Sequence, residues 1–361
     1  MTESVDPRTH LFVYCRGGFE REALLECTAA ARKADLETAQ GTSAAGAAHV
    51  LLPAAAGMLL ERLPFRHLVF ARHMAAVDGE GADLTRGDRL TALRQRLAAI
   101  VPWTGPFADL WLGWPDADAA RVLAPLCRSL EGRLRQALLE DGLLLPDGGG
   151  PRAEVILLSG LQARVGTSLP RNGAQWPMGI PRLALPAGSP SRSALKLEEA
   201  LVLFCPPGRN GCQPRAGQTV VDLGAAPGGW TLAMARRGLT VTAVDRGALT
   251  GPAAMAPGVR HVPDNGFHFR PKVPVTWLLC DMLDKPARVA ELVARWGVNG
   301  WCRRAIFNLK LPMKRRFEAV EQCREHLASA LGHQGRPFRL RFRQLYHDRE
   351  EVTGFLELDV G

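Results

Sequence analysis

Strand-like and helix-like segments alternate regularly through the second half of the chain, and this alternation limits the possible folds more than any other feature. Short apolar runs rich in valine and leucine, typical of buried strands, are separated by longer segments with helical periodicity. The pattern predicts a mostly parallel sheet with helices on both faces. A short connection joins the last two strands, so we expect that pair to be antiparallel and the sheet to end in one reversed strand. The expected strands are 219–223, 240–244, 259–262, 275–280, 305–309, 339–342 and 352–358, and the expected helices are 193–204, 230–237, 287–296 and 316–331.

The first half alternates less regularly and predicts an α+β region of one or two small units. Between the halves, residues 171–190 contain four prolines and three glycines, which is typical of a linker or a wrapping loop. We therefore place the main domain boundary there. The expected strands of the first half are 11–15, 67–71, 108–112 and 153–159, and the expected helices are 20–33, 89–100 and 121–140.

Composition narrows the class of protein. A chain of 361 residues suits two or three domains, and 47% hydrophobic with 22% charged residues indicates a folded globular protein. The eight cysteines form no C-x-x-C pair and the nine histidines do not cluster with them, so we expect buried free thiols in a reducing cytosol and no metal site. The most apolar run, 44–60, falls short of the ~20 residues that span a membrane, and the first residues lack the apolar core of a signal peptide. We expect a cytoplasmic protein without a membrane segment.

The segment VDLGAAPGGWT, residues 221–231, places a glycine turn after the first strand of the second half. It matches neither the G-x-G-x-x-G turn of dinucleotide sites nor the G-x-x-x-x-G-K-[ST] loop of phosphate sites. In open α/β sheets, ligands lie beyond the carboxyl ends of the strands, where glycines let the backbone approach them closely. Asp222, at the end of the strand, would repel a pyrophosphate but suits a cationic amino-acid group. The turn therefore favours S-adenosylmethionine, which carries an ammonium group and a sulfonium.

Two more carboxylates follow the neighbouring strands. Asp245 lies twenty-one residues after Gly224, at the end of the second strand, where an acidic residue accepts hydrogen bonds from a ribose diol. Asp264 follows the third strand and could reach an adenine amino group, although a plain turn residue explains it equally well. A dinucleotide-dependent oxidoreductase is the weaker alternative, because the G-x-G-x-x-G turn is missing.

Four ionisable residues fall at the ends of elements around this turn, namely Lys196, Asp281, Lys310 and Glu351. Each alone has an ordinary structural explanation, but four such charges at one crevice suit removal of a proton from a poorly acidic alcohol. The base must be a neutral lysine, and a second ammonium group together with partial burial lowers the pKa of a lysine. We therefore predict Lys310 as the base and Lys196 as the neighbour that lowers its pKa and orients the nucleophile. Asp281 and Glu351 would hold the lysines. Glu350 is the alternative to Glu351, which we prefer because it directly precedes the last strand.

Other methyl acceptors need residues that this chain lacks at the expected places. Adenine amino groups are usually methylated beside an [ND]-P-P-[YFW] loop after the fourth strand, where this chain has DMLD at 281–284. Methylation of a pyrimidine C5 needs a nucleophilic cysteine in a Pro-Cys loop, and none follows the fourth or fifth strand. A ribose hydroxyl therefore fits best.

Positive charge is concentrated near the predicted base. Residues 301–350 contain twelve Lys and Arg against five Asp and Glu, which favours a nucleic-acid partner over solubility alone. Lys314, Arg315 and Arg316 follow Lys310 closely and could contact phosphates on either side of a target nucleotide. The aromatic residues near this region could stack on bases or simply pack in the core. They are Trp301, Phe317 and Tyr346.

Taken together, these segments resemble the FtsJ-like ribose 2′-O-methyltransferases, which carry a Lys-Asp-Lys-Glu tetrad. The resemblance rests on residues 178–200, 221–231, 280–318 and 343–353, and less clearly on CRGGFE at 15–20 and LPFRHLVFARH at 63–73. It implies a Rossmann-like S-adenosylmethionine-dependent methyltransferase domain at 191–361, preceded by a linker at 171–190. It also implies a ferredoxin-like unit at 1–75 and a THUMP-type RNA-binding domain at 76–170.

The resemblance also implies an activity and a set of site residues. The activity would be methylation of the 2′-hydroxyl of a cytidine in 23S rRNA by a monomer, with Lys310 as the proton acceptor. Ala226 stands where the family has a cysteine, and we expect no effect because the backbone makes the contact. A non-catalytic RNA-binding protein with a relict methyltransferase fold is the alternative. The residues expected to contact the cofactor are Ser191, Ala226, Pro227, Gly228, Gly229, Asp245, Asp264 and Asp281.

Overall fold

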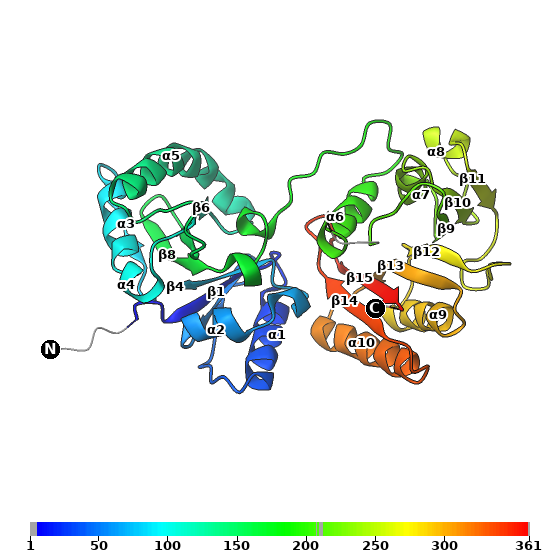
Figure 1. Ribbon diagram of the computed structural model, residues 1–361, viewed down its shortest axis with the longest axis horizontal. Coiled ribbons are helices and arrows are strands. Elements are labelled where there is room, and N and C mark those ends of the chain that lie inside the picture. Colours follow the sequence, from blue (N-terminus) through cyan, green and yellow to red (C-terminus); the bar gives the residue numbers. More distant parts are fainter. Residues whose placement is uncertain (1–5, 207, 209–211, 360–361) are drawn as a thin grey trace. The chain divides into compact units, whose positions relative to one another are not determined.

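The computed structural model describes residues 6–206, 208 and 212–359, which form two compact units with their boundary in the sequence between residues 180 and 181 (Figure 1). This boundary lies inside the segment 171–190 that the sequence predicts as a linker. Among the described residues, no helix is long and apolar enough to cross a membrane.

The second unit is built on a seven-stranded sheet with the order β11-β10-β9-β12-β13-β15-β14. The strands from β11 to β13 are parallel, whereas β15 is antiparallel to both of its neighbours. The antiparallel pairing of the last two strands is confirmed. The prediction that the reversed strand ends the sheet is wrong, because β15 lies between β13 and β14. The strands are β9 Thr219–Leu223, β10 Thr240–Val244, β11 Val259–Val262, β12 Val275–Cys280, β13 Cys302–Lys310, β14 Phe338–Arg343 and β15 Glu351–Leu358.

Helices cover both faces of this sheet, as the alternation predicts (Figure 1). α9 and α10 pack together on one face, and α6 and α7 lie on the other. Trp277 on β12 and Trp296 on α9 are both fully buried. The arrangement leaves the carboxyl ends of β9, β10, β12 and β13 at one edge. The helices are α6 Ala194–Phe204, α7 Gly229–Ala235, α8 Pro252–Met255, α9 Pro286–Val298 and α10 Arg316–Gly332.

The first unit contains one sheet with the order β2-β3-β1-β4-β8-β7-β6, and β5 pairs with β8. The sheet runs through both segments that the sequence assigns to a ferredoxin-like and a THUMP-type unit, and the border between them at residue 75 stays a prediction. The strands are β1 His10–Tyr14, β2 Thr42–Ser43, β3 His49–Pro53, β4 His73–Val77, β5 Ala82–Asp83, β6 Asp109–Gly113, β7 Arg152–Leu157 and β8 Gln162–Ser168. The helices are α1 Glu20–Lys33, α2 Ala56–Arg62, α3 Arg89–Ala98, α4 Val101–Thr104 and α5 Ala124–Glu140, with short 3-10 turns at 65–67, 118–123, 170–172 and 177–179.

The strand predicted at 67–71 is wrong, and a buried carboxylate explains why. Glu26 on α1 accepts hydrogen bonds from the backbone N–H groups of Val69, Phe70 and Ala71 at 2.7, 2.8 and 2.6 Å. These donors are therefore not available to a neighbouring strand. The chain enters the sheet only afterwards, at His73.

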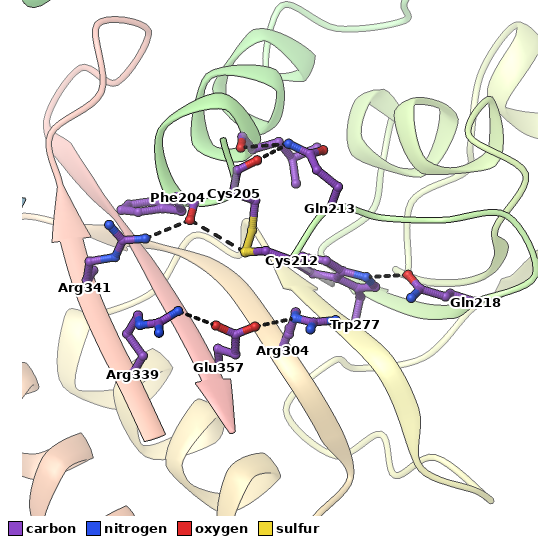
Figure 2. The surroundings of a disulfide bond; sticks show 11 residues. Phe204, Cys205, Cys212, Gln213, Gln218, Trp277, Arg304, Arg339, Arg341 and Glu357 are labelled. Carbon is purple, nitrogen blue, oxygen red and sulfur yellow. Dashed lines mark hydrogen bonds and ion pairs between the residues drawn. A yellow bond between two sulfur atoms is a disulfide. The ribbon is translucent and has the colours of Figure 1, made fainter. Parts of the chain in front are cut away.

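The expectation that all cysteines are free thiols is also wrong for two of them. Cys205, directly after α6, forms a disulfide with Cys212 (Figure 2). The two residues are seven positions apart in the sequence. The other six cysteines are buried thiols. Arg341 on β14 donates to the carbonyl of Phe204 at 2.7 Å, which ties the end of α6 to the sheet beside the disulfide.

Candidate active site

The glycine turn after β9 has the close contacts that its residues predict. Gly224 and Gly228 have positive φ angles of 76° and 112°, which favour glycine. A Cβ atom on Gly224 would lie 2.8 Å from Met282, and one on Gly229 would lie 2.9 Å from Ser193 Oγ. The loop after β12 and the start of α6 therefore pack directly against the turn.

Asp222 lies beneath this turn and is fully buried. Its Oδ2 accepts a hydrogen bond from Thr231 Oγ1 at 2.6 Å, whereas Oδ1 has no partner among the described residues. Burial raises the pKa of Asp222 to about 7, the bond from Thr231 opposes the rise, and the charges of Asp281 and Asp245 add to it. A buried carboxylate oxygen without a donor suits a cationic ligand group, so the turn fits the ammonium of S-adenosylmethionine.

The other predicted cofactor residues surround the same turn. Asp245 accepts hydrogen bonds from the N–H groups of Ala226 at 3.0 Å and Gly247 at 2.8 Å, and so joins the end of β10 to the turn. Ser191 accepts from the N–H of Ser193 at 3.0 Å, beside Gly229. Asp264 is exposed after β11 and accepts from the N–H that follows it. Which of these residues bind the cofactor stays a prediction.

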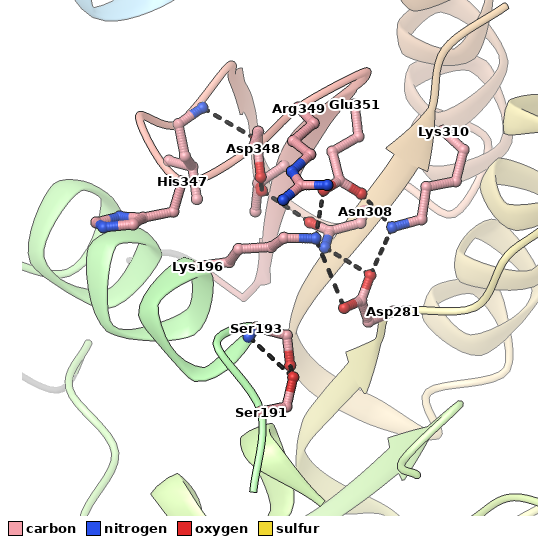
Figure 3. Close-up of polar contacts among 12 residues, drawn as sticks. Ser191, Ser193, Lys196, Asp281, Asn308, Lys310, His347, Asp348, Arg349 and Glu351 are labelled. Carbon is pink, nitrogen blue, oxygen red and sulfur yellow. Dashed lines mark hydrogen bonds and ion pairs between the residues drawn. The ribbon is translucent and has the colours of Figure 1, made fainter. Parts of the chain in front are cut away.

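The four predicted tetrad residues meet at the carboxyl edge of the sheet (Figure 3). Lys310 Nζ lies 2.8 Å from Asp281 Oδ1 and also pairs with Glu351 Oε2. Lys196 Nζ pairs with Glu351 Oε1 and lies 3.9 Å from Asp281 Oδ2. Each lysine therefore contacts both carboxylates. The side chains are partly covered, with 23% of Lys310 and 6% of Glu351 exposed.

Strand register explains this meeting. Lys310 is the last residue of β13 and Glu351 the first of β15, and the two are direct partners in the antiparallel ladder. Side chains of opposite charge that face each other across two strands attract. Glu350 is not part of the cluster, because it is exposed and pairs with Arg316 at 2.6 Å.

The pKa of Lys310 is raised, not lowered as the sequence analysis expects. Burial acts to lower it, but the charges of Asp281 and Glu351 and their hydrogen bonds outweigh burial and raise it above its ordinary value. The expectation counted the second ammonium group and burial but not the short contacts with both acids. In this state Lys310 is a charged ammonium group.

Comparison with known proteins assigns the family. Residues 190–289 match the FtsJ-like methyltransferase model, and residues 9–75 match the RlmM ferredoxin-like domain model. Over 356 residues the chain is 45% identical to ribosomal RNA large subunit methyltransferase M of Methylococcus capsulatus, an alignment that covers 96% of this chain and 98% of the relative. Proteins of the same name from Thauera aminoaromatica and Xylella fastidiosa are 41% and 42% identical, over 96% and 97% of this chain and 96% and 99% of theirs.

The chain belongs to the ribosomal RNA large subunit methyltransferase M family. Membership confirms the predicted fold class, in which a ferredoxin-like region precedes a Rossmann-like methyltransferase sheet in the sequence. The same membership confirms S-adenosylmethionine as the cofactor. It also confirms the resemblance to the FtsJ-like enzymes that the tetrad and the glycine turn indicate.

The basic residues that follow Lys310 differ in exposure and pairing. Lys314 and Arg315 are exposed on the loop between β13 and α10, whereas Arg316 is bound to Glu350. Trp301 precedes the other end of β13, about 30 Å from Lys310 for nine residues of strand. It packs against Trp296, with ring centroids 5.7 Å apart, and so cannot stack on a nucleotide at the tetrad.

Sequence reasoning missed the polar residues that support the tetrad in this family member. Glu199, one turn after Lys196 on α6, is buried and accepts from the N–H groups of Tyr346 and His347 at 2.7 and 3.1 Å. Asn308 is fully buried and donates to Asp281 Oδ1 at 2.8 Å. Strand alternation could have found Asn308, because it lies two residues before Lys310 on the same face of β13.

Proposed function

We propose that this chain methylates the ribose 2′-hydroxyl of a cytidine in 23S rRNA, with Lys310 as the proton acceptor. The observation that carries the proposal is the meeting of two lysines and two carboxylates beside the cofactor turn. The shared name of the relatives, which describes methyltransferases of large-subunit ribosomal RNA, supports the substrate class.

Methylation of a base carbon is less favoured by the chemistry of the site. The cysteine nearest the tetrad in sequence is Cys280, which is fully buried at the end of β12. Burial raises its pKa to about 12, and its neighbours Asp281 and Asp222 act in the same direction. A buried thiol is a poor nucleophile compared with a thiolate. The hydroxyl of a ribose needs no such residue.

S-adenosylmethionine supplies a methyl group on a positively charged sulfonium. The residues that would hold it are Ser191, the turn at 226–229, and the carboxylates of Asp245, Asp264 and Asp281, with Asp222 beneath the turn as the group for the ammonium. The chain itself must orient the ribose hydroxyl and take its proton, a task that depends mainly on positioning.

In the proposed reaction Lys310 binds the hydroxyl and Lys196 orients it from the α6 side. Asp281 and Glu351 keep both ammonium groups in place. Because the same acids raise the pKa of Lys310, only a small fraction of the side chain is neutral at neutral pH. Transfer should therefore speed up as the pH rises toward that pKa.

The proposed RNA partner fits the exposed charge at the mouth of the site. Lys314 and Arg315 would neutralise phosphates on either side of the target nucleotide. The segment 76–170 would add a THUMP-type RNA-binding domain.

The test is methyl transfer from labelled S-adenosylmethionine to unmodified 23S rRNA, followed by identification of the labelled nucleoside. We expect 2′-O-methylcytidine, and Lys310→Ala should abolish transfer while S-adenosylmethionine still binds. Glu350→Gln is the matched control, since Glu350 lies beside the tetrad but outside it. Label on a base would overturn ribose methylation as the reaction and leave S-adenosylmethionine as the methyl donor. Cofactor binding without transfer would favour the alternative, an RNA-binding protein with a relict methyltransferase fold.

A further inference from the structure

A buried chain of polar side chains continues from the tetrad into the sheet (Figure 3). Asn308 Nδ2 lies 2.8 Å from Asp281 Oδ1, and Asn308 Oδ1 lies 2.7 Å from Thr353 Oγ1. Thr353 Oγ1 in turn lies 3.1 and 3.3 Å from the two oxygens of Asp348. Asn308, Thr353 and Asp348 are all fully buried. Asn308 and Thr353 are direct partners in the β13–β15 ladder, so the same register that joins Lys310 to Glu351 builds this chain.

The number of available protons decides which group donates in each of these hydrogen bonds. The carboxylate of Asp281 can only accept, so the amide nitrogen of Asn308 must face it. The amide oxygen of Asn308 can only accept too, so Thr353 must donate its single hydroxyl proton there. The contact between Thr353 and Asp348 then needs a proton from Asp348. Leu345 N–H donates to Asp348 Oδ2 at 2.9 Å, which leaves Oδ1, 3.3 Å from Thr353, to carry the proton.

An ionised Asp348 would satisfy this region poorly. It would take the proton of Thr353 and leave the buried oxygen of Asn308 without a donor. It would also be a buried charge without an ion pair among the described residues. A neutral Asp348 gives every hydrogen bond in this series one donor and one acceptor.

The electrostatic surroundings act in the same direction. Burial raises the pKa of Asp348 well above its ordinary value, and the charges of Glu351 and Glu199 add to this. The N–H of Leu345 and the charge of Lys196 oppose the rise without reversing it. The ionisable groups around Asp348 come from α6, from β15 and from its own turn, and they are Lys196, Glu199, Glu351, His347 and Arg349.

We propose that Asp348 is a protonated acid that fixes the carboxylate of Asp281 through Thr353 and Asn308, and thereby holds Lys310. The three are positioning residues, because none of them touches a reacting atom. Asp281 Oδ1 receives both the N–H of Asn308 and the ammonium of Lys310. Without the amide, that carboxylate could turn away and Lys310 would lose its 2.8 Å contact. The kinetic part of this proposal rests on the proposed function, whereas the protonation of Asp348 does not.

Infrared spectroscopy tests the protonation. At pH 7 we expect a C=O stretching band of a protonated carboxylic acid that shifts in D₂O and is lost in Asp348→Asn. Asp222→Asn is the matched control, because Asp222 is another buried acid with a raised pKa. The band sensitive to Asp348→Asn must survive in Asp222→Asn. Absence of any band that Asp348→Asn removes would overturn the proposal.

Single-turnover methyl transfer tests the positioning. Thr353→Val keeps the shape of the side chain but removes its two hydrogen bonds. We expect the rate to fall roughly 10- to 100-fold, the size of effect seen when a residue that orients a metal ligand is lost. S-adenosylmethionine affinity should not change. Thr353→Ser restores the hydroxyl and Asp348→Asn keeps a donor toward Thr353, so both should stay within about threefold of the native rate.

Equal rates for Thr353→Val and Thr353→Ser would overturn the positioning role. If the valine variant fails to fold, Asn308→Asp replaces it. That change puts a second carboxylate against Asp281, and the proposal requires it to slow transfer and to move the pH dependence of the rate. Near-normal turnover in Lys310→Ala would instead overturn the proposed function and leave the infrared band untouched, so the two failures are distinguishable.

Discussion

Replacing Glu351 with Gln tests the tetrad most directly, because Glu350 next to it is a matched control. The side chain of Glu351 is 6% exposed and pairs with both Lys196 and Lys310. The side chain of Glu350 is 59% exposed and pairs with one arginine. The two substitutions remove the same charge one residue apart in sequence, and only the first removes it from between two ammonium groups.

The structure sets the size of the difference. Removing one partner of a buried ion pair costs about 3–5 kcal/mol, and an exposed pair contributes about 0–1 kcal/mol. Lys310 keeps its 2.8 Å contact with Asp281, and a Gln oxygen still accepts, so we expect about 2–3 kcal/mol for Glu351→Gln. For a unit of this size that lowers Tm by about 4–12 °C, against at most about 4 °C for Glu350→Gln.

The assays are thermal unfolding and single-turnover methyl transfer over a range of pH. Because Glu351 is one of the charges that raise the pKa of Lys310, its loss should move the rising part of the rate profile to lower pH. The rate itself should fall roughly 10- to 100-fold, part of what a positioned acid–base group contributes. Equal effects of the two substitutions on Tm and rate would refute the placement of Glu351 in the tetrad.

Three further outcomes follow from the same contacts. The single-turnover rate of the native protein should rise about tenfold per pH unit between pH 7 and 9, because a raised pKa leaves little neutral Lys310 there, and a flat profile would contradict its role as acceptor. Asp222→Asn should change the pH dependence of stability measured by urea unfolding. Burial raises the pKa of Asp222 in the folded protein to about 7, so its contribution to the free energy of unfolding is complete below about pH 4. That contribution is lost as the pH rises to about 7, by up to about 1.4 kcal/mol per pH unit. The Asn variant should not show this pH-dependent loss of stability. Replacing Lys314 and Arg315 with Gln should reduce the slope of log K for RNA binding against log salt concentration by about 1–2. Lys272 is exposed before β12, at the opposite edge of the sheet, so Lys272→Gln should leave this slope unchanged.

Much of the second unit could be predicted from sequence because its signals are local. The strands at 219–223, 240–244 and 275–280 agree with the structure to the residue, since each is a short apolar run bounded by turn residues. The site residues Asp281 and Lys310 could be placed for the same reason: a residue that ends a parallel strand reaches the ligand edge of the sheet.

What could not be predicted depends on contacts between distant segments. The apolar run at 67–71 looks like a strand, but its N–H groups are bound by Glu26, more than forty residues earlier. The raised pKa of Lys310 depends on two carboxylates from β12 and β15, whose distances the sequence does not contain. The disulfide between Cys205 and Cys212 has no C-x-x-C motif that would announce it in the sequence.

The corrected strand order explains why a tetrad is possible at all. A sheet that ends in one reversed strand is incompatible with a close contact between Glu351 and Lys310, although the sequence predicts both. Neighbouring strands lie about 4.8 Å apart, so a last strand beyond β14 would hold Glu351 about 10 Å from β13. Because β15 lies between β13 and β14, Glu351 faces Lys310 directly and Thr353 faces Asn308. A slip of β15 by one residue would turn Glu351 to the other face of the sheet and away from Lys310, so the register of β15 on β13 is the structural condition for the chemistry.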